Sequence, residues 1–230
     1  MIDINNLEFN YPVLDHKSQQ IRSKFIKLFS KDSNTGKEVN ALKNINLKIL
    51  NGEKVGLIGH NGSGKSTLLR LISGIYFPTK GNIQVKGKVY SILDFSAGIV
   101  KDATGIENVF ILSYLRGATK SQVLNKLDWI KEFSDLDDAL LRPVRTYSSG
   151  MIIRLISSVL LSFNPEIFVL DEFFGAGDKK FTEKVREQIL KMIKNSGVFL
   201  FASHDEALLK SLCNRIITLE NGSIIKDIKI

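Results

Sequence analysis

The chain has little of what secreted or membrane-spanning proteins need. Among its 230 residues there are one cysteine, one tryptophan and four prolines. The single cysteine, Cys213, excludes a disulfide framework within the chain and is typical of a reducing compartment. Apolar stretches such as 159–163 and 167–170 are far shorter than the about 20 residues of a transmembrane helix. Neither end carries a signal-peptide pattern, so we expect a cytoplasmic protein, soluble or peripheral to a membrane.

Size and charge set wide limits on fold and partners. With 43% hydrophobic residues, a chain of 230 residues can bury the core of one α/β domain with a smaller subdomain. The formal charge of +8 is compatible with nucleic acid, an anionic membrane surface or a polyanionic substrate. It is equally compatible with an ordinary solvated surface. Charge alone therefore selects no function.

Residues 59–66 carry the most specific motif. They match the phosphate-binding loop G-x-x-x-x-G-K-S/T, between the apolar run 54–58 and the helix-period run 68–72. Glycines let backbone N–H groups turn toward a triphosphate, Lys65 supplies charge and the Ser66 hydroxyl is a ligand for Mg²⁺. A glycine-rich turn that only joins strand to helix would not need all these positions at once. The residues predicted to bind ATP here are Gly59, His60, Asn61, Gly62, Ser63, Gly64, Lys65, Ser66 and Thr67.

Apolar patterns on both sides of this loop predict a β-rich first part of the chain. Residues 2–9 alternate in the manner of an edge strand, and 41–49 repeats the pattern before an Asn-Gly turn leads into the strand of the phosphate loop. Two short alternating runs, 83–85 and 88–93, predict two further strands.

The pattern changes from strand to helix in the middle of the chain. From about 105 to 163 the apolar spacing is helical, with Asp102 or Thr104 as the N-cap and Pro143 as a break. We therefore expect a helical subdomain over about 102–163.

The last third of the chain alternates strands with a helix, which is typical of a parallel sheet. The buried-strand runs 167–170 and 198–202 flank a charged helix at 180–194. A closing hairpin is predicted from the runs 216–219 and 224–225 around an Asn-Gly turn. The chain has no internal repeat and no low-complexity linker, so one domain is expected.

Two acidic residues follow the strand run 167–170. Asp171 ends the apolar run, and Glu172 comes directly after it. An ordinary acidic turn would have the same sequence. In a chain with a phosphate loop, the pair favours a site for Mg²⁺ and for the water that attacks the γ-phosphate.

A second motif precedes the apolar helix run 152–163. Residues 147–151 read Tyr-Ser-Ser-Gly-Met, which would put a serine and the N–H groups near Gly150 at a helix N-terminus. In isolation the string is also an ordinary serine N-cap. Its position ahead of the Asp171 strand favours contact with a phosphate.

These motifs, in this order, resemble those of ATP-binding-cassette (ABC) ATPases over nearly the whole chain. The resemblance implies an α/β fold, with a P-loop NTPase core of ABC type, an N-terminal antiparallel β subdomain and a helical signature subdomain. It places all of them in a single nucleotide-binding domain, residues 1–230. The cofactors that it implies are ATP and Mg²⁺.

The resemblance also assigns roles to individual residues. The catalytic set would be Glu172, which acts on the attacking water, together with His204, which senses the γ-phosphate, and Lys65. Asp171 would hold Mg²⁺ through water, and Tyr11 would stack on adenine. A structural histidine and a partly buried tyrosine are the alternatives for His204 and Tyr11.

The same resemblance implies a second copy of the chain. In the family geometry the signature residues Ser148, Ser149 and Gly150 meet the ATP of the opposite subunit, in a head-to-tail dimer with two ATP molecules between the subunits. Residues 175–178, Gly-Ala-Gly-Asp, resemble the loop that crosses to that subunit.

One departure from the family pattern falls at 91–98. Most members carry a glutamine in this region, whereas this chain reads Ser-Ile-Leu-Asp-Phe-Ser-Ala-Gly. The Asp94 carboxylate can still bring an oxygen near Mg²⁺ or contact a membrane partner.

This departure, the signature, the 175–178 loop and the Thr-Gly-Ile-Glu-Asn sequence at 104–108 resemble the ATPase subunits of bacterial polysaccharide exporters. The implied function is ATP hydrolysis that powers translocation of a lipid-linked polysaccharide, of O-antigen, capsule or teichoic acid type, through a separate permease. The implied location is the cytoplasmic face of the inner membrane. The alternatives are the ATPase of another ABC transporter and a non-transport ABC ATPase, although no nucleic acid partner is expected.

Residues 13–39 are longer than the connection that a typical cassette needs between its first two strands. The apolar residues with helical spacing are Ile21, Phe25, Leu28 and Phe29, and the cations on much of the remaining surface are Arg22, Lys24, Lys27 and Lys31. One interpretation is a surface helix packed on the sheet edge. The other is a basic amphipathic helix at the membrane surface, near the permease and the lipid-linked glycan.

Overall fold

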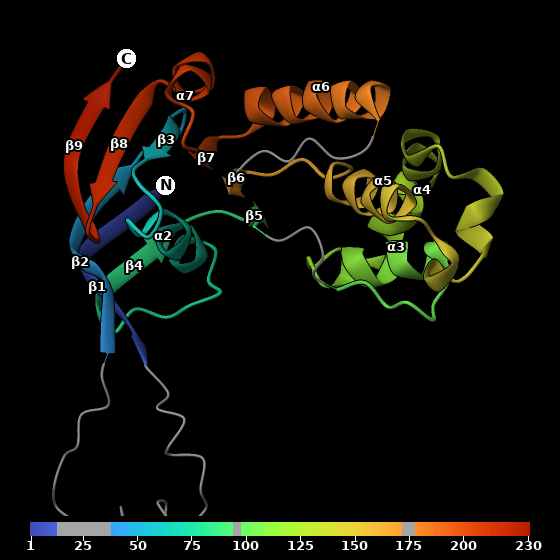
Figure 1. Ribbon diagram of the computed structural model, residues 1–230, viewed down its shortest axis with the longest axis horizontal. Coiled ribbons are helices and arrows are strands. Elements are labelled where there is room, and N and C mark those ends of the chain that lie inside the picture. Colours follow the sequence, from blue (N-terminus) through green and yellow to red (C-terminus); the bar gives the residue numbers. More distant parts are fainter. Residues whose placement is uncertain (13–37, 94–97, 172–177) are drawn as a thin grey trace, which may run out of the picture.

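The computed structural model describes residues 1–12, 38–93, 98–171 and 178–230, which form two lobes (Figure 1). One lobe holds the sheets and the helix of the phosphate loop, and the other is helical. The elements in chain order are β1 (Ile2–Pro12), β2 (Glu38–Ile49), β3 (Lys54–Ile58), α2 (Lys65–Ile72), β4 (Lys80–Val85), β5 (Val89–Ile92), α3 (Gly105–Tyr114), α4 (Lys120–Ser134), η2 (Asp137–Leu141), η3 (Val144–Thr146), α5 (Ser149–Leu160), β6 (Ile167–Asp171), α6 (Lys179–Asn195), β7 (Val198–Ala202), α7 (Glu206–Leu212), β8 (Arg215–Glu220) and β9 (Ser223–Lys229).

The described strands form two sheets. A three-stranded antiparallel sheet has the order β2-β1-β4, and a six-stranded sheet has the order β5-β6-β7-β3-β8-β9. In the larger sheet the strands from β5 to β8 are parallel, and β9 closes the edge as the predicted antiparallel hairpin. The predicted strands are all confirmed.

The prediction that the first strand is an edge strand is wrong. β1 is the central strand of its sheet, because β4 pairs with it on the side opposite to β2. An alternating pattern reports one buried face of a strand and does not report how many neighbours the strand has. The two strands predicted after the phosphate-loop helix lie in different sheets. β4 belongs to the three-stranded sheet, whereas β5 belongs to the six-stranded sheet.

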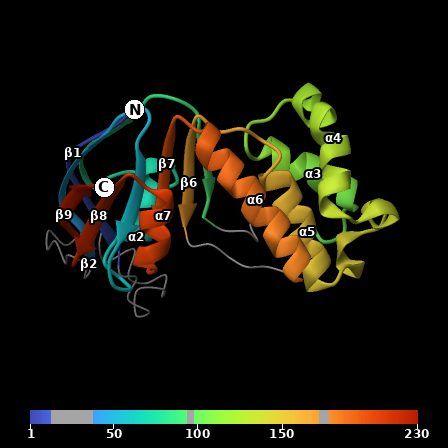
Figure 2. The same ribbon diagram turned by 90° about the horizontal axis from the view of Figure 1, so that it is seen from above.

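The central strands β3, β6 and β7 of the larger sheet are buried on both faces, which explains their nearly continuous apolar runs. Along β6, Phe168 and Leu170 pack on the side of the helical lobe, whereas Ile167 and Val169 pack on the side of α2 and the antiparallel sheet. In Figure 2, α6 runs beside α5 and joins the helical lobe to the sheet. None of the helices within the described ranges has the length and hydropathy needed to span a bilayer.

Capping residues fix where the helices of the second lobe begin. Thr104, and not Asp102, is the N-cap of α3: its hydroxyl accepts a hydrogen bond from the Glu107 N–H, and the Glu107 carboxylate accepts one from the Thr104 N–H. Pro143 interrupts the helical pattern between η2 and η3, as predicted.

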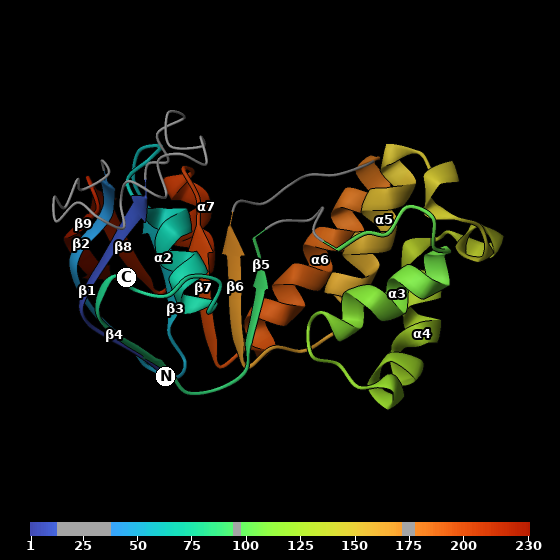
Figure 3. The same cartoon turned by 90° about the horizontal axis from the view of Figure 1, so that it is seen from below.

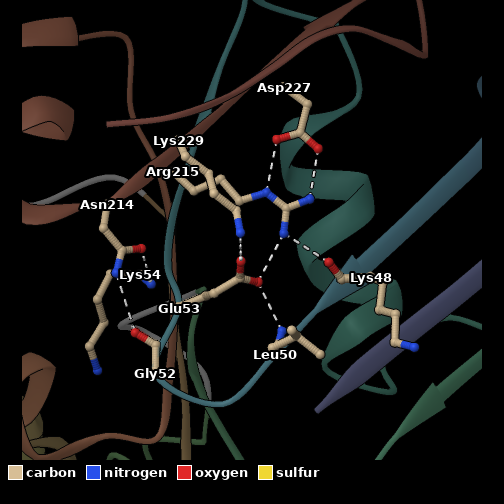
Figure 4. Close-up of polar contacts among 9 residues, drawn as sticks. All are labelled: Lys48, Leu50, Gly52, Glu53, Lys54, Asn214, Arg215, Asp227 and Lys229. Carbon is tan, nitrogen blue, oxygen red and sulfur yellow. Dashed lines mark hydrogen bonds and ion pairs between the residues drawn. The ribbon is translucent and has the colours of Figure 1, made fainter.

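A partly buried ion network joins three strands and the residue directly before β3, at the end opposite the phosphate loop (Figure 4). Arg215, at the start of β8, donates from Nε and Nη2 to the two carboxylate oxygens of Asp227 at 2.8 and 2.7 Å. Its Nη1 donates to Glu53 Oε2 at 2.9 Å and to the carbonyl oxygen of Lys48 at 2.8 Å. The side chains of Arg215 and Glu53 are 12% and 14% exposed, so the charges are paired inside a shielded environment.

Candidate nucleotide-binding site

The phosphate loop joins β3 to α2 at the carboxyl edge of the parallel sheet. Lys65 is the first residue of α2, and its ammonium donates hydrogen bonds to the carbonyl oxygens of Gly59 at 2.7 Å and His60 at 3.1 Å. The residue is 9% exposed. Its charge is therefore folded back over the loop, where an anion would sit.

Two glycines of the loop have no tolerable replacement in this geometry. Gly64 has φ of +107°, and a Cβ there would lie 2.7 Å from Leu42 Cδ2 and 3.0 Å from the Ala41 carbonyl oxygen. A Cβ at Gly59 would overlap the Leu219 carbonyl oxygen. As the N-cap of α2, Gly64 has no side chain with which to cap the helix, so the first N–H groups of α2 are left for a ligand.

The other loop residues differ in exposure. His60, Asn61 and Gly62 are exposed at the outer rim, whereas Ser63 and Thr67 are buried. The His60 ring Nδ1 lies 2.8 Å from the Asn61 carbonyl oxygen. The structure thus brings all the predicted loop residues to one concave turn.

Asp171 and His204 reach the same edge of the sheet as the phosphate loop. Asp171 ends β6 opposite Ala202 of β7, and Ala202 in turn lies opposite Leu57 of β3. His204 follows two residues later and is exposed, between the β7 strand and the N-terminus of α7. Because these strands are parallel, their carboxyl ends bring Asp171 and His204 to the edge of the sheet that carries the loop.

The donor atoms at this edge are of the kind that Mg²⁺ prefers. Ser66 lies in the first turn of α2 and offers a hydroxyl, and Asp171, at the end of the neighbouring β6, offers a carboxylate. Mg²⁺ takes oxygen ligands and is commonly held by one or two carboxylates together with substrate phosphates and water. The residues therefore fit the ion, and their coordination of it stays a prediction.

Tyr11 lies at the end of β1 against the phosphate-loop helix. Its hydroxyl is 3.1 Å from Thr67 Oγ1. Its ring meets Phe9 edge-on at 4.9 Å between centroids and Tyr76 edge-on at 5.9 Å. These contacts fix the ring beside the loop, and its stacking on adenine stays a prediction.

The signature residues begin helix α5. Ser148 is the N-cap, and its hydroxyl accepts a hydrogen bond from the Met151 N–H at 3.3 Å. Ser148 and Ser149 are exposed, and Gly150 is half-buried. Figures 1 and 2 place α5 in the helical lobe and α2 in the other lobe, so the chain does not bring its signature to its own phosphate loop. The N-cap interpretation is confirmed, and contact with phosphate stays a prediction.

Sequence reasoning missed Arg154, which connects the signature helix to α6. Its guanidinium donates to Asp178 Oδ2 at 2.6 Å and to Asp135 Oδ2 at 3.0 Å, and it lies 4.9 Å above the Phe181 ring. Asp178 also caps α6 by accepting from the Phe181 N–H at 2.9 Å. This N–H and Arg154 both lower the pKa of Asp178. An aspartate directly before a helix run predicts an N-cap. No sequence signal predicts that Arg154, far from Asp178 in the chain, forms an ion pair with it.

Several predicted features lie outside the residues that the structure describes. They are Glu172, Asp94, the loop residues 175–177 and residues 13–37 of the inserted segment. The last two residues of the 13–39 segment belong to β2.

The family model described as "ABC transporter" matches residues 42–175. This range holds the phosphate loop, the signature residues and Asp171. The chain belongs to the ABC transporter family. The predicted fold class and the prediction of a transport ATPase are therefore confirmed.

Two relatives illustrate the branch of the ABC family to which the chain is similar. The O-antigen export system ATP-binding protein RfbE of Yersinia enterocolitica is 41% identical, over 96% of this chain and 95% of that protein. The teichoic acids export ATP-binding protein TagH of Lactococcus lactis is 37% identical, over 93% of this chain but 45% of that protein. The predicted resemblance to ATPases of polysaccharide exporters is confirmed.

Solved ABC structures share the fold. One, described as a dimeric post-hydrolysis state of an ATP-binding cassette bound to ADP and Pi, has a TM-score of 0.71 and 23% identity over 100% of this chain and 98% of that one. A second solved structure, of a dimeric bacterial ABC transporter cassette, has a TM-score of 0.67 and 24% identity over 100% of this chain and 98% of that one.

Proposed function

We propose that this chain is the ATP-hydrolysing subunit of an ABC exporter that moves a lipid-linked polysaccharide, of O-antigen, capsule or teichoic acid type, across the inner membrane. A separate membrane-spanning permease would form the path, with the chain bound at its cytoplasmic face. The observation that carries this proposal is 41% identity to an O-antigen export ATP-binding protein over nearly the whole of both chains. The intact phosphate loop supports the same role.

The site residues divide the work of hydrolysis among them. Lys65 and the N–H groups at the start of α2 would bind the phosphates, and Ser66 and Asp171 would hold Mg²⁺, with Asp94 as a further candidate ligand. Bound Mg²⁺ would neutralise charge on the phosphate oxygens. Glu172 would orient and deprotonate the attacking water, and His204 would contact the γ-phosphate from the end of β7.

A second copy of the chain would complete each site. The exposed Ser148 and Ser149 and the free helix end at Gly150 lie in the lobe away from the phosphate loop, which supports a head-to-tail pair in which each signature meets the partner's ATP. ATP binding would close the pair, and hydrolysis would reopen it and move the permease.

Two measurements test the proposal: which membrane protein co-purifies with the chain, and whether polysaccharide export survives when ATP binding is lost. A tagged chain isolated from solubilised membranes should co-purify with a polytopic permease, and replacing the chromosomal gene with a Lys65→Ala version should leave the polysaccharide inside the cell. Normal surface polysaccharide in that strain would refute the export role. Recovery of ribosomes or of a solute importer in place of the permease would assign the chain to another ABC class.

The inserted segment is proposed to lie at the membrane beside the permease, where its cations meet lipid headgroups or the pyrophosphate of the lipid-linked glycan. Replacing Arg22, Lys24 and Lys27 with Gln should leave basal ATP hydrolysis by the isolated chain intact and reduce export. Normal export by the triple variant would refute the membrane role and favour the alternative, a surface helix packed on the sheet edge.

A further inference from the structure

A cavity of about 330 Å³ lies where the two lobes meet. Its walls come from the amino ends of β5 and β6, the end of α3 and the first turns of α4. Figure 3 shows β5 and β6 between the sheet lobe and these helices. Because the phosphate loop lies at the carboxyl ends of the parallel strands, this cavity is separate from the nucleotide-binding site.

Aromatic rings form one wall of the cavity. Tyr90 is 6% exposed, and its hydroxyl donates a hydrogen bond to the Leu160 carbonyl oxygen at 2.8 Å, which fixes the ring. The Phe163 ring lies 6.2 Å from it between centroids. Rigid aromatic faces of this kind suit the apolar face of a small ring-shaped ligand.

Three cations line the same cavity against one carboxylate, that of Glu166. Arg116 is half-buried and donates to the Leu112 carbonyl oxygen at 2.8 Å. Burial lowers its pKa, although neighbouring Tyr90 opposes the shift. The side-chain ammonium groups of Lys88 and Lys126 make no hydrogen bond or ion pair with any residue in the described ranges. Lys88 is exposed, whereas Arg116 and Lys126 are half-buried, so the cavity presents positive charge that an anion would neutralise.

We propose that this cavity binds a small phosphorylated sugar. The phosphate would lie among Lys88, Arg116 and Lys126, with the sugar ring against Phe163. Gln122 and Asn125 on α4 also line the cavity and would receive the hydroxyl groups. The volume lies within the about 300–1,000 Å³ of typical small-molecule sites. A bound ligand would contact both lobes and stabilise one arrangement of them.

The test titrates glucose 1-phosphate into the full chain by calorimetry, with ADP in excess so that the phosphate-loop site is filled. We expect glucose 1-phosphate to bind saturably. Uncharged glucose and inorganic phosphate should bind much more weakly. The variant K88Q/K126Q should bind at least about tenfold more weakly, because each lysine loses a charge-assisted contact. Neither lysine has a structural partner, so the variant should fold.

The matched control is K191Q/K194Q, which removes the same charge from exposed positions of α6. It should bind like the unaltered chain. Equal loss of affinity for glucose 1-phosphate in both double variants would mean that only the net charge of the chain matters, and it would refute binding in this cavity. No saturable binding at millimolar ligand would also overturn the proposal, and equal affinity for inorganic phosphate would refute a sugar as part of the ligand.

Discussion

Lys65 illustrates how a single residue is prepared for its ligand. Two carbonyl oxygens of the loop hold its ammonium over the turn, and burial keeps the long side chain from sampling other rotamers. Because the fold already orders the Lys65 side chain, binding a phosphate costs less side-chain conformational entropy. The glycines contribute differently, by allowing backbone angles and close contacts that a side chain would prevent.

Binding and turnover should separate at two residues. Lys65→Ala should weaken ATP binding by at least about tenfold, since it removes a charged donor, whereas Glu172→Gln should bind ATP normally and lose about 100-fold or more of its turnover. Nucleotide binding measured by fluorescence and steady-state phosphate release give the two quantities. A Glu172→Gln chain with near-normal turnover would remove Glu172 from its role as the base.

Two of the loop glycines with positive φ, Gly62 and Gly64, should tolerate alanine unequally. Gly62→Ala adds a Cβ with no atom within 4 Å, so only backbone strain of about 1–2 kcal/mol is expected. Gly64→Ala has similar strain and also meets Leu42 and Ala41, so its loss of unfolding free energy should be clearly larger. Urea unfolding of both variants checks this. Equal losses would show that the loop relaxes around the new side chain.

At the scale of elements, the Arg215 network joins the end of β2 to β8 and β9, and it includes Glu53, the residue directly before β3. Hydrogen bonds to Arg215 lower the pKa of Asp227. A proton therefore binds Asp227 less readily in the folded chain than in the unfolded one. The resulting stability is present above the unfolded pKa, about 3.9, and is lost as the pH falls through the folded value.

Asp227→Asn should therefore lower the unfolding free energy at pH 7 and change it little at the lowest pH. The effect should be modest, about 1 kcal/mol or less, because the Asp227 side chain is 37% exposed and solvent screens the pair. Chemical unfolding from pH 7 to pH 2.5 measures it. Asp128→Asn, at an exposed position of α4, is the control and should show no such pH dependence. A constant difference at all pH values would contradict the linkage.

At the scale of the molecule, the separation of phosphate loop and signature into two lobes is the feature with the largest consequence. In the proposed head-to-tail pair, the two phosphate loops and the two signatures would meet in two composite sites, and the pair would last only while its ATP is not hydrolysed.

Glu172→Gln with ATP and Mg²⁺ should therefore form a dimer that dissociates when nucleotide is removed. Light scattering with size exclusion measures the mass in both conditions. Lys65→Ala is the matched control and should stay monomeric with ATP. A strictly monomeric Glu172→Gln chain at high protein and ATP concentration would count against the head-to-tail pair.

The sequence by itself determined the phosphate loop, the strand order along the chain and the family, because each depends on local spacing: glycines in a turn, alternation in a strand, and serine or threonine at a helix start. Tertiary structure alone decided that β1 is a central strand and that Arg154 pairs with Asp178. Pairing partners and ion pairs join residues far apart in the chain, and no periodicity encodes which of them will meet. The cavity at Tyr90 and Arg116 is of the same kind, because its lining residues come from parts of the chain that are far apart in sequence.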